Sequence, residues 1–178
     1  MRALLWACLA LWAGQASALS LEDYLDQPER YGQVLLMRHA IAPGTGDPGD
    51  FELGNCASQR NLDARGQAQA IATGERLSAA GFAPQVIATS PWCRCHQTAR
   101  LLALGEPEVD MGLASFFQGH VQRADTLAAF DALLGRIGER SAILVTHFVV
   151  ISAVAGRSPA SGGLVAFNPR TQESWSID

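Results

Sequence analysis

Hydrophobic and polar positions along the chain alternate between two spacings, which predict strands and helices in turn. Continuous apolar runs, typical of buried strands, occupy residues 33–39, 85–90 and 141–147. Shorter strands are expected at residues 107–112 and 163–167, and residues 173–177 are either extended along an edge or paired locally. Helical spacing predicts four helices between these strands, at residues 64–80, 92–104, 124–137 and 148–156.

The helix over residues 64–80 follows Asp63, whose carboxylate suits the N-terminal cap of a helix. Its apolar positions predict an inward face, with the candidates Ala68, Ile71, Ala72 and Leu77. A long loop rich in Gly, Pro and Asp precedes this helix. Loops of that length are usually functional or mobile.

Strands that alternate with helices predict an α/β fold. We expect a three-layer α/β/α arrangement with a mostly parallel central sheet, and a single domain over residues 19–178. In such sheets, ligands bind beyond the carboxyl ends of the strands. Arg38 and His39 end the first strand, Arg94 follows the second, and His147 ends the fourth. We therefore expect two arginines and two histidines to converge on one rim.

The N-terminus has the features of a secretory signal peptide. A positive start at Arg2 precedes a short apolar stretch, and Ala16, Ser17 and Ala18 are the small residues that a signal peptidase accepts. We expect residues 1–18 to be cleaved, which predicts a periplasmic or secreted protein. The apolar stretch is short for a bilayer span, so no stable membrane anchor is expected after cleavage.

The charge balance narrows the classes of partner. All 13 basic residues are arginine and the net charge is -4, which gives no general attraction for nucleic acid or anionic lipid. A small phosphate group held by arginines is still compatible with this composition. A phosphate-loop nucleotide site at residues 44–50 is excluded, because no Gly-Lys-Ser or Gly-Lys-Thr follows and the chain contains no lysine.

Export would place the cysteines in an oxidising compartment. Cleavage removes Cys8 and leaves Cys56, Cys93 and Cys95, a count that fits one disulfide and one free thiol. A zinc site is disfavoured, because histidines at zinc-finger spacing are missing. We therefore expect no metal.

Four segments, in order, resemble motifs of the histidine phosphatase superfamily, also called the phosphoglycerate mutase-like family. They are LLMRHA, LDARGQAQA, ATSPWCRCHQTA and ILVTH. The resemblance covers nearly the whole chain after the signal peptide and implies a phosphoglycerate mutase-like fold. The RHA motif and the small size are closer to the short phosphohistidine phosphatases than to the glycolytic mutases. The signal peptide and the segment LGNCASQRNL are similar to exported members such as the Ais-type lipopolysaccharide core heptose phosphatases.

The resemblance implies a phosphatase that hydrolyses a phosphomonoester through a phosphohistidine. His39 would be the nucleophile, and Arg38, Arg94 and His147 would hold the phosphoryl oxygens. Arginine forks match phosphate oxygens, and nearby positive charge keeps an imidazole neutral and nucleophilic. The implied partner is a small phosphorylated substrate, such as a phosphosugar of the cell envelope. The scheme requires no metal and no cofactor.

Four further side chains are assigned more loosely. Arg60 and Asn61 precede the helix over residues 64–80, where members of the superfamily often contact substrate, and a surface location is the equal alternative. His96 and His120 match no catalytic motif, so both are interpreted as structural or exposed.

The resemblance also bears on the disulfide. Cys95 stands where the family pattern usually has a small alanine, on the inner side of the helix. This implies a Cys56–Cys93 disulfide, with Cys56–Cys95 as the alternative. Either bond would tie the long loop to the helix that carries Arg94.

The chain departs from the family at the proton donor. The mutase-like branch has a glutamate after the third strand, but residues 112–119 contain no carboxylate. The acid-phosphatase branch has an aspartate after the second histidine, where this chain has Phe148. The nearest candidate acids are Asp47, Asp50 and Glu52, in a loop that could fold over substrate. A non-catalytic phosphate-binding module that has lost its acid is therefore the alternative function.

Overall fold

The structure, a computed structural model, describes residues 18–178. The predicted signal peptide lies outside these residues except for Ala18, and so does Cys8. Within the described residues, six strands form one sheet in the order β3-β2-β4-β1-β5-β6. The strands are β1 (Val34–Arg38), β2 (Val86–Thr89), β3 (Glu108–Val109), β4 (Ala142–Thr146), β5 (Leu164–Asn168) and β6 (Glu173–Ile177).

The sheet is mostly parallel, as predicted. Strands β3, β2, β4 and β1 run parallel, whereas β5 pairs antiparallel with β1 and β6 antiparallel with β5. The open question at residues 173–177 is thereby answered, because β6 is an edge strand paired to its chain neighbour. Arg38 lies opposite Thr146 in the ladder between β1 and β4, so these two strands end level with each other.

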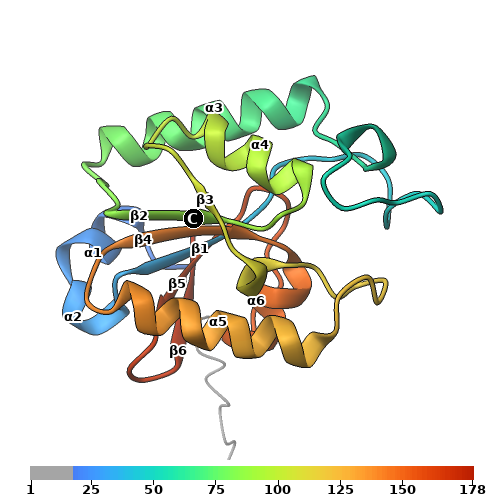
Figure 1. Cartoon of the computed structure of the whole chain (residues 1–178). Coiled ribbons are helices and arrows are strands. Elements are labelled where there is room, and N and C mark those ends of the chain that lie inside the picture. The colour runs from blue at the N-terminus through green and yellow to red at the C-terminus, as the bar shows by residue number, and fades with distance from the viewer. Residues whose placement is uncertain (1–17) are drawn as a thin grey trace, which may run out of the picture.

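Helices cover both faces of the sheet (Figure 1), which gives the three layers that the alternating pattern predicts. On one face lie α3 (Ala64–Ala79) and α4 (Cys93–Leu101), and on the other lie α5 (Arg123–Ile137) and α6 (Phe148–Ala155). The remaining short elements are α1 (Leu21–Asp26), α2 (Pro28–Tyr31), and the 3₁₀ turns η1 (Cys56–Ser58) and η2 (Met111–Leu113). Helices α1 and α2 were not expected from the sequence pattern.

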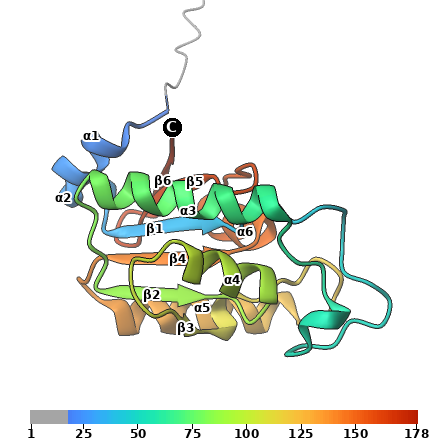
Figure 2. The ribbon, with the colours of Figure 1, turned by 90° about the horizontal axis from the view of Figure 1, so that it is seen from above.

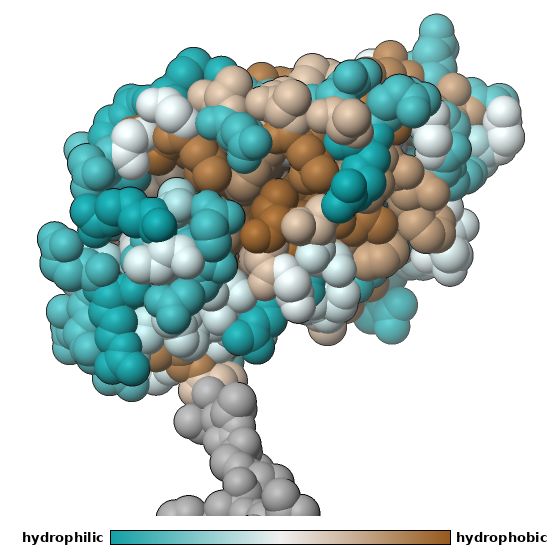
Figure 3. Space-filling model, turned by 90° about the horizontal axis from the view of Figure 1, so that it is seen from below, coloured by the Kyte–Doolittle hydropathy of each residue, from teal (hydrophilic) through white to brown (hydrophobic). Residues whose placement is uncertain are grey.

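Alternate residues of the central strand serve the two layers. Leu35 and Met37 pack with the core beneath α3 and α4, whereas Leu36 packs with Phe130 of α5 and Ile151 of α6. All three residues of β1 are fully buried. On the face that carries α5 and α6, apolar residues extend from the middle to the upper edge of the view, and polar residues gather mainly on the left (Figure 3). Within residues 18–178, no helix combines the length and apolar character needed to cross a membrane.

The inward face predicted for α3 is largely wrong. Asp63 caps the helix as expected, its side chain accepting from the N–H of Gly66. Leu77 is fully buried, but the other three predicted positions are exposed. These positions are Ala68, Ile71 and Ala72.

Close backbone contact explains the difference. A Cβ added at Gly66 would lie 1.9 Å from the carbonyl oxygen of Ile41, and one at Gly74 would lie 2.1 Å from that of Leu102. The buried face of α3 therefore requires glycine at two of its turns. A pattern of apolar side chains predicts a different face, because it does not identify glycine positions as buried.

Candidate active site

The two histidines meet because β1 and β4 end at the same level of the sheet. His39 directly follows β1, and its backbone N–H donates to the carbonyl oxygen of Thr146, at 2.9 Å. His147 directly follows Thr146, and the ring centroids of the two histidines lie 5.4 Å apart. Both residues are buried. The rim predicted from the strand ends is therefore where these side chains converge.

His39 is a neutral imidazole with a defined tautomer. Its Nδ1 lies 2.8 Å from the carbonyl oxygen of Ala40, which can only accept, so Nδ1 carries the proton. Burial lowers the pKa of His39 to about 3, against the opposing effect of the Ala40 hydrogen bond, and the charges of nearby arginines lower it further. The Nε2 atom is therefore unprotonated, with a lone pair for nucleophilic attack.

Three arginines surround this imidazole. The charges of Arg94, Arg38 and Arg60 all act on His39. Arg38 donates from Nη1 to the carbonyl oxygen of Pro159, at 3.0 Å, and lies over the ring of Phe148. Burial, and then the charge of Arg94, lower the pKa of both Arg38 and Arg60. Concentrated positive charge of this kind suits a multiply charged anion.

Arg94 lies in the first turn of α4 and is almost completely buried. The Nε atoms of Arg94 and Arg38 are buried without a hydrogen-bond partner. Buried guanidinium N–H groups usually have hydrogen-bond partners, and these two have none among the described residues.

His147 is held by two polar neighbours. The hydroxyl of Ser90 lies 2.9 Å from its Nε2 atom, and the sulfur of Cys95 lies 3.4 Å from the same atom. Burial, then the charges of His39 and Arg94, hold the pKa of His147 well below its ordinary value. Burial raises the pKa of the Cys95 thiol to about 12, so this cysteine is not a thiolate at neutral pH.

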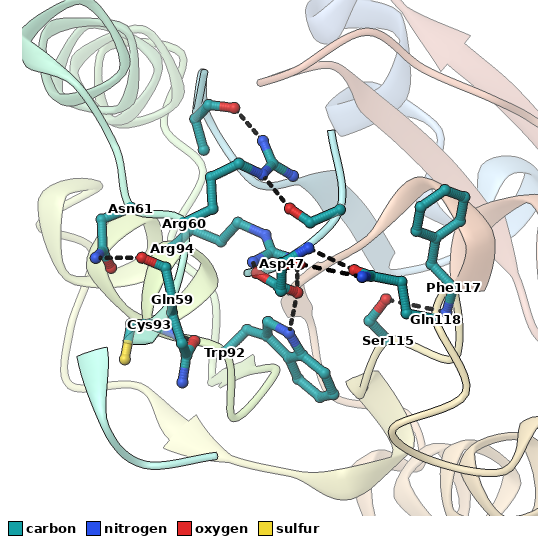
Figure 4. Close-up of polar contacts among 12 residues, drawn as sticks. Asp47, Gln59, Arg60, Asn61, Trp92, Cys93, Arg94, Ser115, Phe117 and Gln118 are labelled. Atoms are coloured by element: carbon teal, nitrogen blue, oxygen red, sulfur yellow. Dashed lines mark hydrogen bonds and ion pairs between the residues drawn. The ribbon is translucent and has the colours of Figure 1, made fainter. Parts of the chain in front are cut away.

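Asp47 reaches this cluster from the long loop after β1. Its carboxylate accepts from Nη1 and Nη2 of Arg94, at 2.6 and 3.1 Å, and from the indole N–H of Trp92, at 2.9 Å (Figure 4). Burial alone would raise the pKa of Asp47, but the hydrogen bonds and charge of Arg94, with the Trp92 N–H, lower it below its ordinary value. The carboxylate is therefore ionised in this arrangement.

The other two candidate acids lie elsewhere. Asp50 and Glu52 are exposed residues, and neither lines the cleft at His39. Glu52 instead accepts from the side-chain amide of Asn55, at 3.1 Å. Asp47 is thus the carboxylate that the described residues place in this cleft.

The cleft has a volume of about 130 Å³. This is about the volume of four water molecules, so the cleft suits a phosphoryl group and is small for a complete ligand. The residues that line it are Arg38, His39, Gly44, Thr45, Gly46, Asp47, Arg60, Arg94, Ser115, Phe117, Gln118, His120, His147 and Phe148.

Arg60 and Asn61 separate in the structure. Arg60 lines the cleft and binds the backbone of the loop, donating from Nε to the carbonyl oxygen of Gly46, at 2.8 Å, and from Nη1 to that of Ala42. Asn61 is exposed and lines a separate pocket of about 950 Å³. Of the two interpretations given for Asn61, its position favours the surface location over contact with substrate in the His39 cleft.

The loop between β1 and α3 is covalently attached beside Arg94. Cys56 and Cys93 form a disulfide, the pairing preferred in the sequence analysis, and Cys95 is the buried free thiol. Figure 2 shows the loop extending beyond the carboxyl ends of the strands. The disulfide therefore connects this extension to the residue that precedes Arg94.

Sequence reasoning missed a second loop at the rim, over residues 114–122. Gln118 and His120 line the cleft, and His120 is exposed, as interpreted from the sequence, although its place at the cleft was not expected. The ring of Phe51 lies between Trp92 and His120, with centroid distances of 5.4 and 4.2 Å. The loop follows β3, whose carboxyl end lies on the same rim, and this was the available signal.

The described residues contain no group of three or more His, Cys, Asp or Glu side chains placed to hold a metal ion. The chemistry available here is that of a neutral imidazole nitrogen within a cluster of arginines. Such an arrangement can bind a phosphoryl group and attack its phosphorus atom.

Comparison with solved structures places the fold among phosphatases. A phosphoserine phosphatase from Entamoeba histolytica superposes with a TM-score of 0.58 at 13% identity, covering 80% of this chain and 93% of that chain. The protein histidine phosphatase SixA gives 0.54 at 17% identity, covering 80% and 92%. A mycobacterial glucosyl-3-phosphoglycerate phosphatase gives 0.54 at 17% identity, covering 74% and 87%. At these identities the likeness is one of fold.

A search of curated proteins gave no significant match. The family model described as the histidine phosphatase superfamily (branch 1) matches residues 34–126, which are 93 of the 178 residues. The match includes His39 and Arg94. The chain belongs to the histidine phosphatase superfamily, branch 1.

Proposed function

We propose that this protein is a phosphatase that hydrolyses a phosphomonoester through a phosphohistidine on His39. The observation that carries the proposal is the free Nε2 atom of a buried, neutral imidazole among three arginines. Family membership and the phosphatases of similar fold support the same reaction class. None of these relatives fixes the substrate, because their names cover three different phosphorylated compounds.

The reaction has two steps. Nε2 of His39 attacks phosphorus, and the bond between phosphorus and the bridging oxygen breaks with its electron pair on that oxygen. Water then attacks the phosphohistidine, and the electron pair of the P–N bond returns to Nε2. Arg38, Arg94 and His147 hold the three non-bridging oxygens, whose charge they stabilise in both steps. Arg60 contributes further positive charge from the loop.

We propose an exported protein that acts on a phosphosugar of the cell envelope. The leader-like N-terminus and the Cys56–Cys93 disulfide support an oxidising compartment. The resemblance of the LGNCASQRNL segment to exported heptose phosphatases supports the substrate class.

The alternative is a phosphate-binding module without turnover. The ion pair between Asp47 and Arg94 favours it, because the carboxylate in the cleft is ionised and holds no proton to donate. Phosphate release from an aryl phosphate and from a panel of phosphosugars distinguishes the two. A phosphatase releases phosphate and carries label on histidine after an alkaline quench, in which phosphohistidine is stable. A binding module binds inorganic phosphate, measured by calorimetry, and releases none.

A further inference from the structure

Asp47 stands where a phosphoryl group is expected to bind. Its two carboxylate oxygens accept from Nη1 and Nη2 of Arg94, in the two-pronged geometry with which arginine also holds phosphate. Both side chains are buried, with exposed fractions of 3% for Asp47 and 4% for Arg94. Nη1 and Nη2 of Arg94 each donate one N–H to Asp47, whereas Nε has no hydrogen-bond partner in the described part of the chain. A phosphate that uses the Arg94 fork must therefore displace Asp47.

Two further contacts hold this carboxylate in place. The side chain of Gln118 bonds both backbone polar groups of Asp47, accepting from its N–H and donating to its carbonyl oxygen, the latter at 3.1 Å. Phe51, four residues further along, stacks on Trp92, whose indole N–H donates to this carboxylate. Figure 4 shows Asp47 enclosed by Arg94, Trp92 and Gln118. These contacts join the two loops that line the cleft of about 130 Å³.

We infer that Asp47 is an internal anion that occupies the phosphate subsite, and that substrate displaces it into the role of proton donor. The inference rests on the proposed function. Other charged or titratable side chains face the same cleft: Arg38, His39, Arg60, Arg94, His120 and His147. Among the described residues that line the cleft, Asp47 is the carboxylate that can supply the acid missing from residues 112–119.

Displacement changes the protonation of Asp47. Once a phosphoryl group takes the Arg94 fork, the carboxylate loses the contact that keeps it ionised and acquires a neighbouring anion. A phosphomonoester that arrives as its monoanion carries one proton, since the second pKa of such esters is about 6. That proton passes to Asp47, whose other oxygen can keep the indole N–H of Trp92 as its donor.

The donor step balances with the two-step reaction. As Nε2 of His39 bonds to phosphorus, the bridging oxygen leaves with its electron pair and takes the proton of Asp47, so that an alcohol departs. In the second step the Asp47 carboxylate takes a proton from the attacking water and passes it to the phosphate, which is released as its monoanion. Nε2 recovers its lone pair, and the released phosphate leaves before the carboxylate returns to Arg94.

The test compares Asp47→Asn with Asp50→Asn, an equal change of charge at an exposed position of the same loop. Calorimetry measures the affinity for inorganic phosphate. We expect Asp47→Asn to bind phosphate at least about tenfold more tightly than the wild type, because it lacks the competing charge. We expect Asp50→Asn to stay within about twofold. Equal or weaker phosphate binding by a folded Asp47→Asn protein overturns the occupancy of the subsite.

The donor role is measured by kcat on two esters. Asp47→Asn should lose about 10²-fold or more on glycerol phosphate, whose alkoxide needs a proton, and less than about tenfold on nitrophenyl phosphate. Equal losses on the two esters, or no loss on either, overturn the donor role. A wild-type protein that releases phosphate from neither ester overturns the proposed function together with the donor role. The phosphate affinities still decide whether Asp47 occupies the subsite.

A second variant covers the case in which Asp47→Asn does not fold. Gln118→Ala removes an exposed side chain that forms hydrogen bonds with the backbone of Asp47, and it leaves the carboxylate itself intact. Tighter phosphate binding by Gln118→Ala is the expected result, because the Gln118 hydrogen bonds favour the arrangement in which Asp47 is paired with Arg94. Phosphate affinity equal to that of the wild type, or weaker, overturns the inference.

Discussion

The ring of His39 donates its Nδ1 proton to the carbonyl oxygen of Ala40, the next residue of the chain, at 2.8 Å. A single local bond thereby fixes both the orientation of the imidazole and the identity of its free nitrogen. Because β1 ends at Arg38, Ala40 lies outside the strand, and its carbonyl oxygen accepts a hydrogen bond from the ring. In the proposed reaction, this contact at the end of β1 orients the nucleophile and leaves its Nε2 atom unprotonated.

Replacing the nucleophile should abolish turnover. We expect His39→Ala to reduce kcat by more than about 10³-fold, because no other group in the cleft supplies an unprotonated nitrogen at that point. The measurement is phosphate release, with circular dichroism to verify folding. His96→Ala is the matched control, since His96 lines the separate pocket beside the disulfide. Activity of His39→Ala near that of the wild type would contradict the mechanism.

The two buried histidines should make stability fall with acid. Burial lowers the pKa of His39 to about 3, below the ordinary value of 6.5, so between these values the unfolded chain binds a proton that the folded protein does not. The stability that such a histidine contributes is therefore fully present above pH 6.5. It decreases as the pH falls below 6.5, by about 1.4 kcal/mol per pH unit for each histidine. His147 acts in the same direction. Urea unfolding at pH 7 and pH 5 measures the difference.

The control for this pH dependence is His39→Ala, which removes one of the two titrating groups. Its free energy of unfolding should change less between pH 7 and pH 5 than that of the wild type. The titration of Asp47 does not enter this window, because the folded pKa of Asp47 lies below its ordinary value of 3.8. Identical slopes for the two proteins would refute the assignment of a neutral, buried His39.

Reduction of the disulfide should destabilise the protein. The bond joins residues separated by 37 positions, and closing a loop of such length stabilises by about 2 to 4 kcal/mol. Chemical unfolding with and without dithiothreitol measures the loss. The double variant Cys56→Ser/Cys93→Ser should show the lower stability in both conditions. A response of this variant to the reductant would show that another thiol reaction is responsible.

Replacing glycine by alanine should destabilise the protein at one helical position and stabilise it at another. Gly74→Ala places a Cβ 2.1 Å from the carbonyl oxygen of Leu102, so α3 must shift, at a cost of about 1 to 3 kcal/mol. Gly135→Ala, within α5, places its Cβ in open space and should stabilise by about 0.5 to 1 kcal/mol. Thermal unfolding of the two variants tests the pair. Stabilisation by Gly74→Ala would mean that α3 does not approach α4 so closely.

The sequence predicts the sheet and its rim well because both depend on local pattern. Apolar runs locate β1, β2 and β4, and the rule for parallel strand ends then brings His39 and His147 together. The parallel fold and the helices on its two faces follow from the same alternation. The short helices α1 and α2 carry no comparable periodicity, and the pattern therefore does not predict them.

Features that depend on contact between distant segments are not predicted by the pattern of apolar and polar residues. The placement of Asp47 on Arg94 is set by a loop whose shape depends on Gln118, 71 positions away. The buried face of α3 depends on how closely backbones approach, which apolarity does not measure. His120 lies in the cleft because its loop follows β3, and a motif search assigns no role to a residue outside a motif.

The position of β1 within the sheet determines when the surroundings of His39 form during folding. Both neighbours of β1, the strands β4 and β5, come from the far end of the sequence, and the N–H of Gly162 is donated to the carbonyl oxygens of Arg38 and His39, at 3.1 Å each. The edges of β1 are paired only when segments more than 100 residues away arrive. Such long-range closure is slow compared with the formation of local structure. We therefore expect the geometry of His39 to be among the last features to form during folding, so that an incomplete chain ending before residue 142 has no organised site.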